Sequence, residues 1–212
     1  QQKLQFLSLV TFQNSGYLPL VLVAALLPPE KSGPLFIYLF LFLLGCNLII
    51  WSLGVYMLTF TRAKRFELGS FFSPPVIAAL FSLIFIYLGL NTFVPEMILK
   101  PLRLVGDCTL PLAMMVVGGN LAQIRLGKID KKAISLLLLA KLIILPLLGI
   151  GLILKFKIPE LIGLLILIQL AVPSATSLSI IMRHYKKEDL LISQGIFFSH
   201  IFGLFTLPIF LS

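Results

Sequence analysis

The chain alternates long apolar runs with short polar loops. Seven runs are each close to the roughly 20 residues that cross a bilayer as a helix, and they cover residues 4–27, 35–60, 71–90, 104–124, 133–154, 161–182 and 190–211. The third run has Pro74 and Pro75 at its start, which a helix tolerates because first-turn N–H groups have no helical partner. We expect residues 92–101 to form an interfacial segment before the fourth run. The pattern predicts an all-α membrane protein with seven spans.

The composition agrees with a membrane protein. Hydrophobic residues make up 59% of the 212 positions and charged residues 12%, whereas soluble domains are about 45–50% apolar and about 25% charged. Cys46 and Cys108 lie in or beside apolar runs and form no CxxC or Cys/His set. We therefore expect neither a structural zinc site nor a disulfide framework.

Basic residues between the runs predict the orientation. Ten Lys and Arg residues follow the second, fourth and sixth runs, namely Arg62, Lys64, Arg65, Arg125, Lys128, Lys131, Lys132, Arg183, Lys186 and Lys187. Five fall in the other loops, namely Lys31, Lys100, Arg103, Lys155 and Lys157. The positive-inside rule places the larger set in the cytoplasm, so the chain starts inside and ends outside the cell membrane. Because Gln1 stands in place of Met, almost directly before an apolar run, we expect the chain to begin part-way through a longer protein.

Several functional classes are excluded. The net charge of +9 lies in short loop clusters without interleaved aromatic residues, which argues against a nucleic-acid interface. A G-protein-coupled receptor has its first end outside, opposite to the orientation predicted here. It also carries Asp-Arg-Tyr at the inner end of its third span, whereas the third run of this chain ends outside in Leu-Asn-Thr at residues 90–92. The sequence has no phosphate loop, HExxH or GxSxG, so we expect no enzyme, no bound metal and no cofactor.

Two of the runs carry a helix-breaking polar motif near mid-depth. The first run contains Gln-Asn-Ser-Gly-Tyr-Leu-Pro at residues 13–19, and the sixth contains Gln-Leu-Ala-Val-Pro-Ser-Ala-Thr-Ser at residues 169–177. At 1.5 Å per residue, Asn14 and Pro173 lie roughly 15 and 18 Å into their runs, close to the bilayer midplane. Each motif alone is consistent with a proline-kinked helix. Two breaks in antiparallel helices, at corresponding positions of two halves, instead favour a transporter site with a cavity beside the broken backbone.

Other polar residues lie within the runs. Lys141 is about 12 Å from the inner end of its run, and both a functional role and a structural one by pairing or snorkelling stay open. Asp107 is separated from it by roughly 14 Å along the membrane normal, so we expect Lys141 to face the carbonyl end of a broken helix, Asn120 or a bound anion. His200 is interpreted as a packed, hydrogen-bonded histidine and Asn47 as a helix–helix contact. The secondary polar or coupling candidates are Asn47, Asp107, Asn120 and His200.

Several of these motifs resemble the auxin efflux carrier family, which includes plant PIN-type auxin exporters and bacterial permeases proposed for malonate and malate. Residues 14–20 are similar to the Asn-x-Gly-x-x-Pro break of its fourth helix, and residues 47–54 to its fifth helix. Residues 111–119, with the acidic Asp107 before them, are similar to the seventh helix. Lys141 and Pro146 are similar to a basic residue followed by a proline in the eighth helix. The ninth and tenth are matched by residues 169–173, Tyr185, residues 189–193 and residues 206–208.

The resemblance covers essentially the whole chain and implies its architecture. The seven runs would be helices four to ten of a ten-helix, five-plus-five inverted repeat with crossed broken helices, on the plan of bile-acid symporters. Residues 1–60 would be the last two helices of the first repeat, residues 61–73 a cytoplasmic linker, and residues 74–212 the second repeat. The three helices preceding this chain would supply scaffold and dimer contacts, so the full-length protein is expected to be a homodimer.

The resemblance also implies a function. We expect a secondary transporter of small organic anions such as carboxylates, with export favoured and with coupling to H⁺ or Na⁺ left open. Half-helix N-termini suit an anion, and Asn14 and nearby hydroxyls would donate to it. The expected substrate-binding residues are Asn14, Gly16, Pro19, Gln169, Pro173, Ser174, Thr176, Ser177 and Lys141. Two alternatives stay open, a non-transporting membrane ligand sensor or scaffold and a Na⁺- or H⁺-coupled carrier of the bile-acid-symporter type.

Overall fold

The structure is a computed structural model that describes residues 2–59, 74–124, 127, 129–187 and 190–211. The elements named within these residues are helices, and one isolated antiparallel β-bridge joins Gln13 to Ser174. The predicted linker at residues 61–73 and the basic residues Arg62, Lys64, Arg65, Arg125 and Lys128 lie outside the described part.

Both predicted breaks are present as gaps between half-helices. The first run forms α1 (Gln2–Thr11) and α2 (Tyr17–Leu26), and the sixth forms α10 (Glu160–Ala171) and α11 (Ser177–His184). Proline removes a backbone donor and clashes with the preceding turn, which explains why neither helix continues through its motif.

Three other runs form long helices. The second run forms α3 (Pro29–Ile49), a π-helical turn η1 (Ile50–Gly54) and α4 (Val55–Thr59). The fifth forms α8 (Lys131–Leu139), a second π-helical turn η4 (Ala140–Ile144) and α9 (Leu145–Phe156), and the seventh forms α12 (Leu190–Leu211). Pro146 lies two residues after the end of η4 and has no N–H to donate to the preceding turn, which accounts for the wider turn there.

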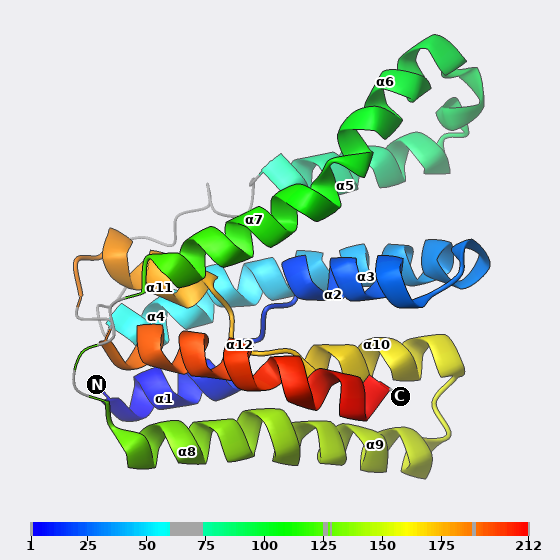
Figure 1. Cartoon of the computed structure of the whole chain (residues 1–212). Coiled ribbons are helices and arrows are strands. Elements are labelled where there is room, and N and C mark those ends of the chain that lie inside the picture. The colour runs from blue at the N-terminus through cyan, green and yellow to red at the C-terminus, as the bar shows by residue number, and fades with distance from the viewer. Residues whose placement is uncertain (1, 60–73, 125–126, 128, 188–189, 212) are drawn as a thin grey trace.

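The third and fourth runs form an arm that leaves the body of the molecule (Figure 1). It contains α5 (Pro74–Tyr87), the 3₁₀ turn η3 (Leu90–Phe93), α6 (Glu96–Asp107) and α7 (Thr109–Ala122), and α7 packs against α2. Cys108 keeps a right-handed helical backbone, so α6 continues into α7. The expected start of this helix at residue 104 is therefore wrong, since the helix begins at Glu96 after Pro95. Its charged residues recur every three or four positions and leave the opposite face apolar, namely Glu96, Lys100, Arg103 and Asp107.

Within the described residues, four helices are long and apolar enough to cross a membrane. They are Glu30–Ile49, Glu96–Ala122, Lys131–Phe156 and Leu190–Leu211, and two shorter apolar helices are Tyr17–Leu26 and Glu160–Ala171. The shorter ones belong to the broken runs. The third run enters the described part only at Pro74, so the count of seven spans stays a prediction.

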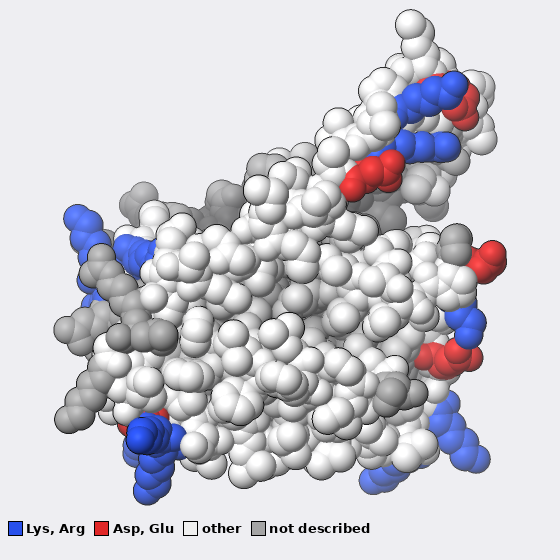
Figure 2. All heavy atoms as spheres, viewed as in Figure 1, with Lys and Arg blue, Asp and Glu red and all other residues white. Residues whose placement is uncertain are grey.

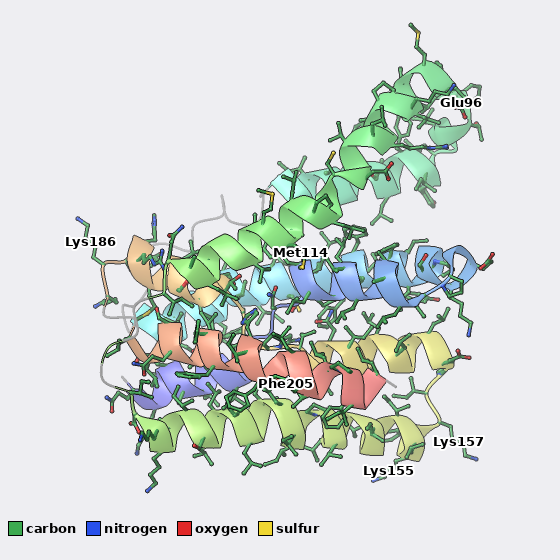
Figure 3. The ribbon with its side chains drawn as sticks, viewed as in Figure 1. Glu96, Met114, Lys155, Lys157, Lys186 and Phe205 are labelled. Atoms are coloured by element: carbon green, nitrogen blue, oxygen red, sulfur yellow. The ribbon has the colours of Figure 1, made fainter. Side chains whose placement is uncertain are left out.

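The body has a core on each side of the two breaks. One cluster joins α1, α4, α11 and α12 around Leu9, Leu58 and Ile181, and the other joins α2, α3, α10 and α12 around Val23, Leu39 and Ile168. The ends of the body carry Lys, Arg, Asp and Glu side chains, and the surface between them is free of these residues on the face shown in Figure 2. Lys186 lies at one end, and Lys155 and Lys157 at the other (Figure 3). A multi-pass membrane protein has this distribution, because charged side chains stay outside the hydrocarbon core.

Candidate functional site

The two breaks cross and pair through their backbones. The Asn14 N–H donates to the Pro173 carbonyl at 2.8 Å, and the Ala175 N–H donates to the Phe12 carbonyl at 3.0 Å, on either side of the Gln13–Ser174 bridge. Backbone at this depth cannot be left without partners. Each broken helix therefore supplies part of what the other lacks, and the cavity expected beside the breaks stays a prediction.

The carboxyl end of α1 receives side-chain donors from two other elements. The Ser174 hydroxyl donates to the Leu9 carbonyl at 2.8 Å, and the Lys141 ammonium donates to the Val10 carbonyl at 3.0 Å. These carbonyls have no partners within α1, and a cation near a helix C-terminus is favourable. Lys141 is fully buried in the π-helical turn η4. Of its three expected partners, the structure shows the carbonyl end of a broken helix.

Asn14 contacts His200, and this contact defines the orientation of both side chains. His200 Nδ1 lies 2.8 Å from the Ile196 carbonyl, and His200 Nε2 lies 3.2 Å from Asn14 Nδ2. A carbonyl oxygen only accepts, so Nδ1 carries the proton in this arrangement and Nε2 is free to accept from the Asn14 amide. His200 is thus a buried, hydrogen-bonded histidine that orients the amide of Asn14.

Gln169 reaches the other side of the crossing. Its Nε2 donates to the Ser15 carbonyl at 3.2 Å, which determines which arm of the amide points toward the break. Its Oε1 is buried without a hydrogen-bond partner, as is Thr206 Oγ1 on α12. Buried polar atoms without partners are uncommon in proteins, so Gln169 Oε1 calls for an explanation.

One face of α12 packs against α1 and the second break through small residues. A Cβ atom on Gly195 would lie 2.5 Å from Leu9 Cδ1, and one on Gly203 would lie 3.6 Å from Pro173 Cδ. Between them, Ser199 Oγ accepts from the Ser174 N–H at 3.2 Å. The sequence analysis missed Ser15 and Ser199. The spacing of Gly195, Ser199 and Gly203, four residues apart, is the small-residue pattern of close helix contacts and could have indicated Ser199.

The other predicted residues divide into two groups. Gly16 and Thr176 precede the first residues of α2 and α11, Ser177 begins α11, and Pro19 is buried in the first turn of α2, so all four lie at the crossing. Asn47 is half-buried on α3, while Asp107 is exposed and Asn120 half-buried on the arm. Among the described residues, neither Asp107 nor Asn120 forms a hydrogen bond or ion pair with the crossing residues.

Two further features bear on the chemistry. A hollow of about 800 Å³ lies between α1, α8 and α12 at the end where the chain starts, with Gln5, Asp130, Lys132 and Gln194 in its lining. No group of three His, Cys, Asp or Glu side chains that could hold a metal ion occurs among the described residues.

Comparison with known proteins identifies the family. Residues 60–211 match a family described as membrane transport protein, which is the auxin efflux carrier family. The match includes α5 to α12, with the second break, and does not extend to the first break at residues 13–19. Comparison with curated proteins and with solved structures gave no match. Since the match extends over more than half of the chain, this protein belongs to the membrane transport protein family of auxin efflux carriers.

Proposed function

We propose that this protein is a secondary carrier of small organic anions such as carboxylates, with its substrate site at the crossing of the two broken helices. One observation carries the proposal. Among the described residues, Lys141 is the one Lys, Arg, Asp or Glu whose side chain is buried, and it lies at the crossing on the Val10 carbonyl. A buried cation without a carboxylate partner is costly in a membrane, and a bound anion would compensate its charge.

The backbone at the crossing also favours an anion. Two of its helix ends expose carbonyl groups, and these are used within the protein, by Ser174, Lys141 and Ala175 at the end of α1 and by Asn14 at Pro173. At the start of α11, the Leu178 and Ser179 N–H groups already donate to the Ala175 and Thr176 carbonyls. Among the described residues, the first-turn N–H groups of Tyr17, Leu18 and Ser177 are the ones without a hydrogen-bond partner. Such N-termini favour negative charge.

Side chains at the same place add donors. One N–H of the Asn14 amide is directed to His200, and the amide has a second N–H to offer. The hydroxyls of Thr176 and Ser177 stand at the start of α11. A carboxylate held between these groups would have donors from both broken helices.

Transport would follow from movement of one helical bundle against the other about this site. On the inverted-repeat plan, residues 1–60 close the first repeat and residues 74–212 form the second, with dimerisation in the full-length protein. Export, a cytoplasmic start of the chain and coupling to H⁺ or Na⁺ belong to the same proposal.

Counterflow in proteoliposomes tests the function. Vesicles loaded with an unlabelled carboxylate should take up the labelled compound, and Lys141→Met should lower this uptake by at least about ten-fold, because a bound anion loses its buried counter-charge. Lys132→Met is the matched control, since Lys132 is an exposed lysine at the start of the same helical run. Its uptake should equal that of the unchanged protein.

The same assay separates the alternatives. Carboxylate binding without flux would contradict a carrier and favour a sensor or scaffold. Uptake that needs a Na⁺ or proton gradient would identify the coupling ion. Equal uptake by Lys141→Met and Lys132→Met would show that the buried charge of Lys141 does not support anion transport, and would contradict the anion proposal.

A further inference from the structure

Gln169 has one side-chain atom that the protein leaves without a partner. The residue is 2% exposed on α10, and its Nε2 donates to the Ser15 carbonyl in the first break. That bond determines the orientation of the amide, because a flipped amide would place Oε1 against the Ser15 carbonyl, and two acceptors repel. The free atom is therefore the acceptor Oε1.

The position of Gln169 relates this acceptor to the proposed anion site. Ser15 follows Asn14 directly, and consecutive Cα atoms are about 3.8 Å apart. Asn14 contacts His200 and pairs with Pro173, so the amide anchored on Ser15 is next to the donors proposed for the carboxylate. A ligand whose carboxylate faces Asn14 would bring its neighbouring carbon atoms near Gln169.

The crossing thus combines hydrogen-bond donors with one buried acceptor that has no partner. Asn14 and the starts of α2 and α11 offer N–H groups, whereas Gln169 offers an oxygen. A buried acceptor that stays unpaired is unfavourable, and a ligand that donates to it removes that cost. A site of this kind discriminates strongly against an analogue that lacks the donating group.

We propose that the crossing selects organic anions that carry a hydroxyl or N–H group close to the carboxylate, and that this group donates to Gln169 Oε1. The inference depends on the proposed anion site and narrows its substrate class. Gln169 acts as a specificity-determining residue, and Ser15 holds it in place through its carbonyl. A 2-hydroxy acid fits the arrangement better than the corresponding acid without the hydroxyl.

Competition between matched acids tests the proposal. Lactate and propionate differ in one hydroxyl, as do malate and succinate, and each would compete with a labelled carboxylate for binding to the protein in liposomes. The hydroxylated member of each pair should bind at least about ten-fold more tightly. Gln169→Met keeps the length of the side chain and should reduce the difference to within about two-fold, because the acceptor is lost.

Gln5→Met is the matched control, since Gln5 is a buried amide on α1 away from the crossing. It should keep the preference for the hydroxylated acids.

The outcomes are distinct. If the paired acids bind equally to the unchanged protein, the inference is overturned while the anion carrier stands. A preference that survives Gln169→Met also overturns it, because another group must then accept the hydroxyl. If none of the four acids binds, both the inference and the proposed function fail. Should Gln169→Met not reach the membrane, the comparison in the unchanged protein still decides, since equal affinities there contradict the proposal.

Discussion

The Asn14 N–H donates to the Pro173 carbonyl at 2.8 Å and so joins the first broken helix to the second. Asn14 belongs to the gap between α1 and α2, and Pro173 to the gap between α10 and α11. Because the protein replaces lost helical hydrogen bonds in one break with groups from the other, a substitution in one break should weaken the hydrogen bonding of both.

Asn14→Ala should weaken carboxylate binding by about 1.5–3 kcal/mol, the range for a hydrogen bond to a charged group. Thr176→Ala should cost less, because the neighbouring Ser177 hydroxyl can replace the lost donor. Asn47→Ala is the control, an amide on α3 instead of at the crossing. Titration of carboxylate affinity measures the effect, and unchanged affinity in Asn14→Ala would refute the placement of the site.

Ser174→Ala should lower stability more than affinity. The Ser174 hydroxyl donates to the Leu9 carbonyl, and its removal leaves a buried carbonyl without that donor, at a cost of about 1–3 kcal/mol. Thermal unfolding in detergent should show a lower midpoint than for Ser135→Ala, which changes an exposed serine on α8. A loss of carboxylate affinity at an unchanged midpoint would instead place Ser174 in direct contact with the substrate.

His200→Gln should retain most transport. A glutamine oxygen can accept from the Asn14 amide in place of His200 Nε2, so the orientation of Asn14 is preserved. His200→Leu offers no acceptor and should transport less at equal abundance in the membrane. Complete loss of transport in His200→Gln would show that His200 carries the coupling proton.

Gly195→Ala should destabilise the protein, whereas Gly203→Ala should be tolerated. Both glycines are buried on α12, but a Cβ on Gly195 would lie 2.5 Å from Leu9 and 2.9 Å from Leu137, while one on Gly203 would lie 3.6 Å from Pro173. Overpacking of a core costs about 1–3 kcal/mol. Comparison of the two thermal midpoints measures this difference, and equal midpoints would contradict the close packing of α12 on α1.

Single cysteines should report opposite membrane sides at the two ends of the body. With Cys46 and Cys108 replaced by serine, a membrane-impermeant thiol reagent added from outside should label Lys157→Cys and should not label Lys132→Cys or Lys186→Cys. The expectation follows from the excess of basic residues in the loops that contain Lys132 and Lys186, which the positive-inside rule places in the cytoplasm. Labelling of Lys132→Cys or Lys186→Cys from outside would reverse the proposed orientation.

The positions of the two breaks were determined by local sequence. Pro19 and Pro173 remove backbone donors wherever the chain places them, and Gly16 weakens the helix further, so these effects need no knowledge of distant residues. The apolar runs and the loop charges were equally readable, because hydrophobicity and charge act through local composition. The start of the helix at Glu96 was not, because its charged residues interrupt the apolar run along the chain although they share one helix face.

Only the tertiary structure decided what the polar residues in the runs contact. The sequence left Lys141 with three candidate partners, and the choice of the Val10 carbonyl depends on how η4 packs beside the end of α1. The anchoring of Gln169 on Ser15 and the pairing of Asn14 with Pro173 likewise join segments that are distant in the chain. Backbone groups carry no residue-specific signal in a sequence, and which of them need a partner becomes definite only when the broken helices cross.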